Sequence, residues 1–251
     1  MTATAKTRID LLLVERGLVP SRERARAMIL AGRVMVAEQK VDKPGATVPV
    51  EATIRLLGED QPYVSRGGIK LAGALEHWKI DVKGRWCLDV GASTGGFTDC
   101  LLKNGAAHVT AVDTGFGQIA MALRQDERVR LMERTNARLL EPGALAAKSG
   151  EELTLLVMDV SFISATLVLP PVVAAAKSLT ESVVLVKPQF EAGREHVGKG
   201  GIVRDPDAHQ LAIDKVAACV ESIAWRVVET IASPITGMEG NKEFLLYARR
   251  G

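Results

Sequence analysis

Four charged residues stand on separate polar segments of the chain, and their types suit group transfer to an alcohol. They are Lys70 in SRGGIKL, Asp159 in MDVSFIS, Lys187 in LVKPQF and Glu243 in GNKEFLL. Two amines and two carboxylates that meet beside a cofactor loop could deprotonate an alcohol and hold its oxygen for methyl transfer. This interpretation requires a fold that brings the four segments together.

Lys187 is the predicted base, because it follows the apolar run VVLV and burial favours the neutral form of an amine. Lys70 would add a second positive charge and stabilise the developing oxyanion, while Asp159 and Glu243 would orient the two amines. Asp159 and Lys187 both follow strands expected to end at the ligand-binding edge of a sheet. Spacing alone says little about Lys70 and Glu243, and a single charged residue at a strand end is most often just solvated.

A glycine-rich turn in CLDVGASTGGFTDCLL follows a predicted strand that ends in Asp89, and a helix is expected to begin near Phe97. The next strand, HVTAVD, ends in Asp113, where an acid can accept hydrogen bonds from both hydroxyls of a ribose. A glycine-rich turn followed by such an acid can bind either NAD or S-adenosylmethionine. The turn GASTGG departs from GxGxxG, and its Ser and Thr fit the amino-acid end of S-adenosylmethionine, so the methyl donor is favoured over NAD. Asp89 could face the ammonium group of that donor.

The composition is that of a folded globular chain, with 251 residues, 47% hydrophobic and 25% charged. No apolar run approaches the roughly 20 residues that cross a bilayer, and MTATAKTRID lacks the apolar centre of a secretory signal, so a cytoplasmic location is expected. The three cysteines share no CxxC spacing and the four histidines are scattered. We expect neither a disulfide framework nor a metal site.

The first 58 residues hold ten Lys/Arg and six Asp/Glu, a charge of +4, whereas the remainder carries −2. In this segment Ser21 is predicted to cap a helix over RERARAMIL that ends near Gly32, followed by short antiparallel strands. Arg22 and Arg26 would project together from that helix. A basic front segment on a nearly neutral body indicates contact with a polyanion, although a solvated basic face would look similar.

Apolar, strand-like runs alternate with helical patterns after this segment, which predicts an α/β fold whose strands form a mostly parallel sheet and are buried on both faces. The runs are RWCLDV, HVTAV, VRLME, LTLLVMDV, SVVLVK, AWRVVETI and FLLYA. The stretch GEDQPYVSRGG interrupts both periodicities. We therefore predict a small α+β domain over residues 1–58, a linker over 59–64 and a Rossmann-like domain over 65–251.

The order of these motifs resembles the TlyA family of ribosomal RNA cytidine 2′-O-methyltransferases, which join an S4-type RNA-binding domain to an FtsJ-like methyltransferase domain. RIDLLLVERGLVPSRERARAMILAGRV resembles the S4 element, and YVSRGGIKL, DVGASTGGFTDCLL, AVDTGFGQ, ERTNAR, MDVSFIS, LVKPQFEAGR, GKGGIVRD and SPITGMEGNKEFLL resemble successive family motifs. The resemblance covers nearly the whole chain. The linker GEDQP is its least family-like piece.

The resemblance implies S-adenosylmethionine as methyl donor and places a Lys-Asp-Lys-Glu tetrad on Lys70, Asp159, Lys187 and Glu243. It places the donor loop on Gly91, Ser93, Thr94, Gly95 and Phe97, and Asn136 near the adenine; together with Asp89, Asp113 and Asp159 these are the predicted cofactor-binding residues. It also implies that the front domain recognises ribosomal RNA, from the small subunit, the large subunit or both. Six arginines there suit contacts with RNA phosphates: Arg8, Arg16, Arg22, Arg24, Arg26 and Arg33.

Three other interpretations of the sequence stay open at this stage. An NAD-dependent oxidoreductase would use the same sheet, and an RNA-binding or ribosome-assembly protein would use the front domain beside an inactive methyltransferase fold. A cytolytic role is implied by the older hemolysin name of the family. The sequence shows no obligate protein partner and nothing that favours a membrane.

Overall fold

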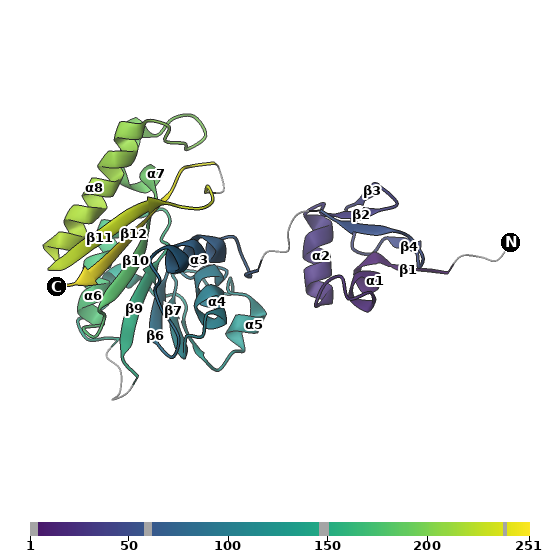
Figure 1. Cartoon of the computed structure of the whole chain (residues 1–251), viewed down its shortest axis with the longest axis horizontal. Helices are drawn as coiled ribbons and strands as arrows, with labels where there is room; N and C mark the ends of the chain where they lie inside the picture. The colour runs from purple at the N-terminus through teal and green to yellow at the C-terminus, as the bar shows by residue number, and fades with distance from the viewer. Residues whose placement is uncertain (1–4, 58–61, 146–150, 238–239) are drawn as a thin grey trace. The chain divides into compact units, whose positions relative to one another are not determined.

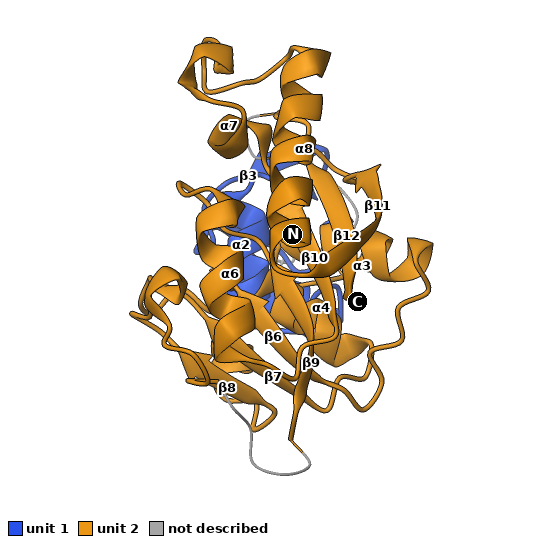
Figure 2. Cartoon of the chain, turned by 90° about the vertical axis from the view of Figure 1, so that its left-hand side faces the viewer, with its two compact units in different colours: residues 1–60 blue, residues 61–251 orange. Residues whose placement is uncertain are grey.

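The computed structural model describes residues 5–57, 62–145, 151–237 and 240–251. The chain divides into two compact units, residues 1–60 and 61–251 (Figure 2). The predicted linker, residues 59–64, spans this division, and its first three residues lie outside the described residues. Its last residues are held by the second unit, because Val64 N donates to Asp99 Oδ2 (2.8 Å) and Lys103 Nζ donates to Pro62 O (2.6 Å). The domain boundaries at 58 and 65 stay predictions.

The first unit packs two helices against short antiparallel strands. Its elements are β1 (Lys6–Arg8), α1 (Ile9–Glu15), α2 (Arg22–Leu30), β2 (Val34–Val36), β3 (Gln39–Val41), β4 (Thr47–Pro49) and β5 (Ile54–Leu56). Strand β1 pairs with β4, and β2 pairs with β3 and β5. The predicted α2 is confirmed: Ser21 Oγ accepts from Arg24 N (3.2 Å), and Gly32 follows with φ +66°. Helix α1 was not predicted.

The second unit is built on a seven-stranded sheet in the order β11-β12-β10-β9-β6-β7-β8. The strands are β6 (Trp86–Val90), β7 (His108–Val112), β8 (Val129–Met132), β9 (Leu153–Met158), β10 (Glu181–Val186), β11 (Trp225–Ala232) and β12 (Phe244–Arg250). Strands β6 to β10 are parallel, and β12 runs antiparallel to both β10 and β11. The predicted mostly parallel α/β sheet is therefore confirmed, with every predicted strand present.

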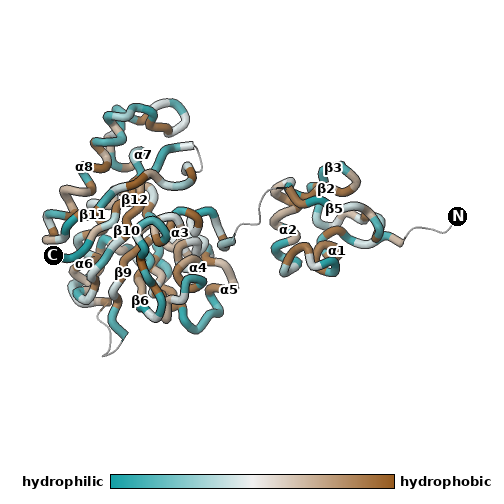
Figure 3. Tube along the Cα trace, viewed as in Figure 1, coloured by the Kyte–Doolittle hydropathy of each residue, from teal (hydrophilic) through white to brown (hydrophobic). Residues whose placement is uncertain are grey.

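Helices cover both faces of this sheet (Figures 1 and 2). One core lies under α3 (Gly67–His77) and α4 (Gly96–Lys103), and the other under α6 (Ala165–Ala175) and α8 (Pro206–Ser222). The shorter elements are α5 (Met121–Arg124), η1 (Ala137–Leu139), α7 (Pro188–Glu191) and η2 (Arg194–His196). The two cores enclose the apolar stretches of the central strands, which Figure 3 shows by hydropathy.

One strand departs from the expected burial on both faces. Strand β11 lies at the edge of the sheet and leaves Arg226 and Glu229 exposed. A register shift between Val227 and Glu229 interrupts its pairing with β12. An edge strand with charges and a bulge is protected against pairing with other chains. The apolar run AWRVVETI therefore predicted the strand correctly but its burial wrongly.

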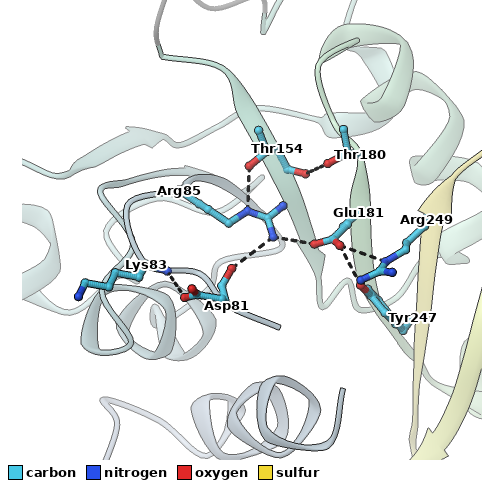
Figure 4. Close-up of polar contacts among 8 residues, drawn as sticks. All are labelled: Asp81, Lys83, Arg85, Thr154, Thr180, Glu181, Tyr247 and Arg249. Atoms are coloured by element: carbon cyan, nitrogen blue, oxygen red, sulfur yellow. Dashed lines mark hydrogen bonds and ion pairs between the residues drawn. The ribbon is translucent and has the colours of Figure 1, made fainter. Parts of the chain in front are cut away.

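A polar network ties the strands together at the edge where the parallel strands begin (Figure 4). Arg85 donates to Glu181 Oε2 (2.6 Å) and to Thr154 Oγ1 (3.0 Å), and Tyr247 and Arg249 donate to Glu181 Oε1 (2.9 and 3.1 Å). Burial acts to raise the pKa of Glu181, but the hydrogen bonds from Arg85 and Tyr247 outweigh it and lower that pKa below its usual value. The network fixes β9, β10 and β12 at this edge, and the opposite edge carries the candidate site.

Candidate active site

Two buried ion pairs stand at the carboxyl edge of the parallel strands. Lys70, on α3, places Nζ 2.5 Å from Oε2 of Glu243, which immediately precedes β12. Lys187, the residue after β10, places Nζ 2.6 Å from Oδ1 of Asp159, the residue after β9. The structure therefore gives each predicted amine a predicted carboxylate as its partner.

The pairing of β10 with β12 brings the two ion pairs together. Val186 lies opposite Phe244 at the end of this ladder, so the next residues, Lys187 and Glu243, leave neighbouring strands at the same point. Because side chains alternate along a strand, both project to the sheet face covered by α3. The four residues form a single cluster, which we call the tetrad: Lys70, Asp159, Lys187 and Glu243.

The tetrad is nearly closed to solvent. The side chains of Lys70 and Lys187 are each 10% exposed, that of Glu243 is 3% exposed and that of Asp159 is 20% exposed. Buried charges are tolerated when they are paired and hydrogen-bonded. Lys187 Nζ donates a hydrogen bond to Ser161 Oγ (2.7 Å), whereas its contact with Asp159 Oδ1 is an ion pair without hydrogen-bond geometry. Lys187 is thus held by a charged partner and a hydroxyl, and Asp159 Oδ1 keeps no hydrogen-bond partner among the described residues.

A cavity of about 510 Å³ opens beside Asp159 and includes part of the predicted cofactor loop. Its walls include five predicted cofactor residues: Gly91, Ser93, Asp113, Asn136 and Asp159. Gly91 has φ +86°, and a Cβ at this position would come within 2.4 Å of the Asp159 carbonyl oxygen. Only glycine permits this close approach. Asp113, after β7, accepts hydrogen bonds from the backbone N–H groups of Ser93 (2.8 Å) and Gly115 (2.6 Å), which orient its carboxylate in the wall.

The matching family models cover both units of the chain. An FtsJ-like methyltransferase model matches residues 63–250, and an S4 domain model matches residues 7–54. The chain belongs to the FtsJ-like methyltransferase family. The predicted resemblance to TlyA proteins, with an S4 domain ahead of the FtsJ-like domain, is confirmed.

Curated relatives of this FtsJ-like protein match over most of their length. The chain is 45% identical over 245 residues to the 16S/23S rRNA (cytidine-2′-O)-methyltransferase TlyA of Mycobacterium tuberculosis, covering 97% of this chain and 90% of the relative. It is 38% identical to Hemolysin A of Brachyspira hyodysenteriae, covering 96% and 98%. The names methyltransferase and hemolysin are therefore both carried by relatives that this chain matches over most of their length.

Solved structures match the whole chain and the methyltransferase fold separately. A structure from Streptococcus thermophilus, described as a hemolysin, is 42% identical with a TM-score of 0.73, covering 99% of this chain and 90% of that one. An S-adenosylmethionine-dependent methyltransferase from Mesorhizobium loti is 13% identical with a TM-score of 0.53, covering 72% and 98%. The latter likeness supports the Rossmann-like fold alone.

Four predicted cofactor residues of this FtsJ-like domain are absent from the described cavity wall: Asp89, Thr94, Gly95 and Phe97. Thr94 is exposed, and its carbonyl oxygen accepts from Ala120 N (3.1 Å). Gly95 takes φ +94° at the N-terminus of α4, and Phe97 is only 3% exposed in the core beneath α3. In this structure they shape and support the loop that carries Gly91 and Ser93.

Asp89 is fully buried behind the cofactor loop. Its Oδ2 accepts from Thr98 Oγ1 (2.6 Å), while Oδ1 has no hydrogen-bond partner among the described residues. Burial raises the pKa of Asp89 to about 7, and the hydrogen bond from Thr98 offsets part of that rise. Its predicted contact with an ammonium group stays a prediction.

The sequence did not predict several residues of the cavity wall, among them Gln118, Thr135, Ser161, Phe162 and Ile163. Phe162 is 92% exposed and has φ +63°, which is strained for a non-glycine residue. Its ring lies 5.5 Å from that of Phe190, and Lys187 Nζ lies 5.9 Å from the Phe190 ring. An exposed aromatic surface therefore stands beside the tetrad. The signal available in the sequence for this aromatic surface was the phenylalanine in the segment DVSFIS.

Three of the six predicted RNA-binding arginines, Arg8, Arg16 and Arg22, make the following side-chain contacts within the first unit. Asp10, fully buried in α1, accepts from Arg8 at both oxygens (2.9 Å each) and from Arg22 Nε (2.9 Å). The hydrogen bond from Arg8 holds the pKa of Asp10 well below its usual value, against the effect of burial. Arg16 donates to the carbonyl oxygens of Val50 and Ala52.

These contacts correct the expected pairing of two arginines on α2. Arg22 is held by α1, whereas Arg26 is exposed, so the two do not project together as a free pair. Arg24 and Arg33 are half-buried. A role in RNA binding stays a prediction for all six.

Within residues 5–57, 62–145, 151–237 and 240–251, no group of three or more His, Cys, Asp or Glu is placed to hold a metal ion. In the same ranges, no helix has the length and apolar character needed to span a membrane.

Proposed function

We propose that the protein transfers a methyl group from S-adenosylmethionine to the ribose 2′-hydroxyl of a cytidine in ribosomal RNA. The observation that carries the proposal is the buried tetrad at the edge of the 510 Å³ cavity. A relative of nearly the same length, 45% identical, is named for this reaction. The S4 domain, with the basic excess of the first 58 residues, supports RNA as the acceptor.

The cavity fits the proposed methyl donor. When bound, S-adenosylmethionine supplies a methyl group on a positively charged sulfur, which keeps the electron pair of the broken carbon–sulfur bond and leaves as a neutral thioether. Asp113 would accept hydrogen bonds from the ribose hydroxyls of the donor, and Asn136 would lie near its adenine. Because Gly91 has no side chain, its backbone lies close to the backbone of Asp159 in the cavity wall.

The tetrad would act on the acceptor hydroxyl. Lys187, when neutral, would accept the 2′-hydroxyl proton as the oxygen bonds to the methyl carbon, while Asp159 and Ser161 keep its amine in position. Lys70, held by Glu243, would stabilise the negative charge that develops on the oxygen. Because these groups are already paired and buried, little rearrangement is needed when the substrate arrives.

The base of the acceptor nucleotide would stack on Phe162. A ring that is 92% exposed, strained at φ +63° and beside the tetrad offers a flat surface to an unstacked base. Single-strand stacking elsewhere is a smaller contribution, because aromatic residues are only 4% of the chain. Structured ribosomal RNA, or a ribosomal subunit in the cytoplasm, is therefore the proposed partner.

Transfer of tritiated methyl from S-adenosylmethionine to ribosomal RNA tests this function. The wild-type protein should label the RNA, and Lys187→Ala should abolish labelling while still unfolding cooperatively at a midpoint above the temperature of the assay. Calorimetry should show binding of S-adenosylmethionine and none of NAD. RNA binding without donor binding would instead favour the inactive ribosome-assembly protein.

The relative named Hemolysin A keeps a cytolytic role as a second candidate. Release of dye from liposomes at low protein concentration would support it. We expect no release, because the buried apolar residues of α3, α4, α6 and α8 pack into the two cores of the sheet.

A further inference from the structure

A second cavity, of about 480 Å³, includes Glu243 of the tetrad in its wall. It is formed by the start of α8, the segment that follows β11 and the start of β12. Its lining includes His209, Gln210, Ile213, Ser233, Thr236 and Phe244. This volume is within the roughly 300–1,000 Å³ of small-molecule sites, and nothing in the proposed reaction has used it.

Each cavity has one residue of the tetrad in its wall. Asp159 lines the first cavity and Glu243 lines the second. Lys187 links these two residues, since it pairs with Asp159 and leaves β10 beside Glu243. An acceptor ribose bound at the tetrad would therefore be next to both cavities.

The walls of the second cavity suit a planar, partly polar group. The rings of His209 and Phe244 lie 5.5 Å apart, and Ile213 adds an aliphatic surface. Gln210 and Thr236 are exposed and bring an amide and a hydroxyl to the rim. Apolar faces with polar groups at the edge are the complement of a nucleobase.

Two cationic side chains stand at the rim of the second cavity. Lys242 is exposed in the cavity wall, directly before Glu243. Arg66, at the start of α3, donates from Nη2 to the carbonyl oxygen of Thr236 (2.5 Å) and so stands at the same rim. Phosphate contacts of this kind fix the register of a nucleic acid and leave the base to an adjacent pocket.

The second cavity is held in shape by a buried amide. Asn241, 1% exposed and two residues before Glu243, accepts from Val203 N (2.9 Å) and donates to Gly201 O (2.9 Å). His209 Nε2 lies 2.9 Å from the carbonyl oxygen of Val203. These bonds join α8, the glycine-rich segment before it and the start of β12, so the cavity does not need to be formed by its ligand.

We propose that this second cavity binds the nucleobase next to the methylated nucleotide, with Lys242 and Arg66 contacting the phosphate between them. The inference rests on the proposed function, because it takes the tetrad as the place of the acceptor ribose. It makes the cavity a determinant of which RNA sequence or shape is accepted.

Filling the cavity tests the proposal. Ala232 is exposed, lines the cavity and pairs with Phe244, so Ala232→Phe would occupy the space intended for the base. We expect its KM for ribosomal RNA to rise about ten- to hundredfold, as loss of one stacked base would do, with unchanged affinity for S-adenosylmethionine. Val228→Phe is the matched control, because Val228 is 42% exposed on the same strand and lies outside the cavity lining. It should leave both quantities at their wild-type values.

The outcomes separate the two proposals. If the wild type methylates RNA and the two variants have equal KM, the second cavity is not the nucleobase site although the proposed function stands. If the wild type transfers no methyl group, the proposed function and this inference are both overturned.

Photocrosslinking identifies the occupant. A benzoylphenylalanine placed at Gln210, on the rim, should crosslink to the nucleotide adjacent to the methylated one, whereas the same group at Ala218, exposed farther along α8, should not. Crosslinking to the methylated nucleotide itself, or equal crosslinking from both positions, would overturn the assignment.

Discussion

Replacement of Lys70 by methionine should destabilise the second unit strongly, because it leaves a buried carboxylate without its partner. Glu243 is 3% exposed and its Oε2 lies 2.5 Å from Lys70 Nζ. Removal of one member of such a pair costs about 3–5 kcal/mol. Arg128→Met is the matched control: it leaves Asp126, whose side chain is 23% exposed, and should cost at most about 1 kcal/mol.

The free energy of unfolding in urea, followed by tryptophan fluorescence, measures this difference. All three tryptophans, Trp78, Trp86 and Trp225, lie in the second unit, so the signal reports on that unit alone. Addition of Glu243→Leu to Lys70→Met should recover most of the lost stability, because the unpaired charge is then gone. If Lys70→Met costs no more than Arg128→Met, the pair is not buried as described and the argument for a preorganised tetrad fails.

Three further predictions follow from individual contacts. Asp89, with its pKa raised to about 7, holds a proton in the folded state that the unfolded chain releases above about pH 3.9. The free energy of unfolding therefore falls as the pH rises from about 3.9 to about 7. Asp89→Asn should raise the thermal unfolding midpoint over wild type more at pH 8 than at pH 5, and equal increases at the two pH values would contradict the argument from burial. Glu191, 4% exposed, accepts from Ala165 N (2.6 Å) and so joins α7 to the N-terminus of α6. Glu191→Ala should lower kcat for RNA methylation about tenfold, since small misplacements of catalytic groups are costly. Glu191→Gln, whose amide oxygen still accepts, should restore most of that activity, and equal kcat for both variants would exclude this positioning role. Arg26→Ala should weaken RNA binding and reduce its salt dependence by about one charge without lowering the thermal unfolding midpoint. Arg22→Ala should lower that midpoint, because it takes a partner from the buried carboxylate of Asp10. The reverse pattern in filter binding and thermal melts would refute the assignment of Arg26 to RNA and Arg22 to the fold.

The sheet could be predicted from the sequence because its strands are short apolar runs flanked by helical patterns. Asp159 and Lys187 follow such runs directly, so their position at the ligand-binding edge was predictable. Lys70 and Glu243 were not, since they are 173 residues apart and no local spacing encodes their contact. Only the family resemblance assigned them.

The rest of the site depends on long-range or strained geometry. Phe162 adopts φ +63°, which no residue propensity predicts. The ion pairs of Asp10 depend on α1, whose seven residues, IDLLLVE, are too short and too uniformly apolar to show a helical period. The arginines that look equivalent in the sequence therefore differ in the structure.

Ribose-methylation mapping tests the central claim most directly. Ribosomal RNA from cells that lack these marks is incubated with the protein and S-adenosylmethionine, and the products are analysed by nucleoside mass spectrometry. We predict 2′-O-methylcytidine with the wild type and none with Lys187→Ala. Methyl groups on a base, or equal 2′-O-methylation by the variant, would contradict the assignment of the tetrad.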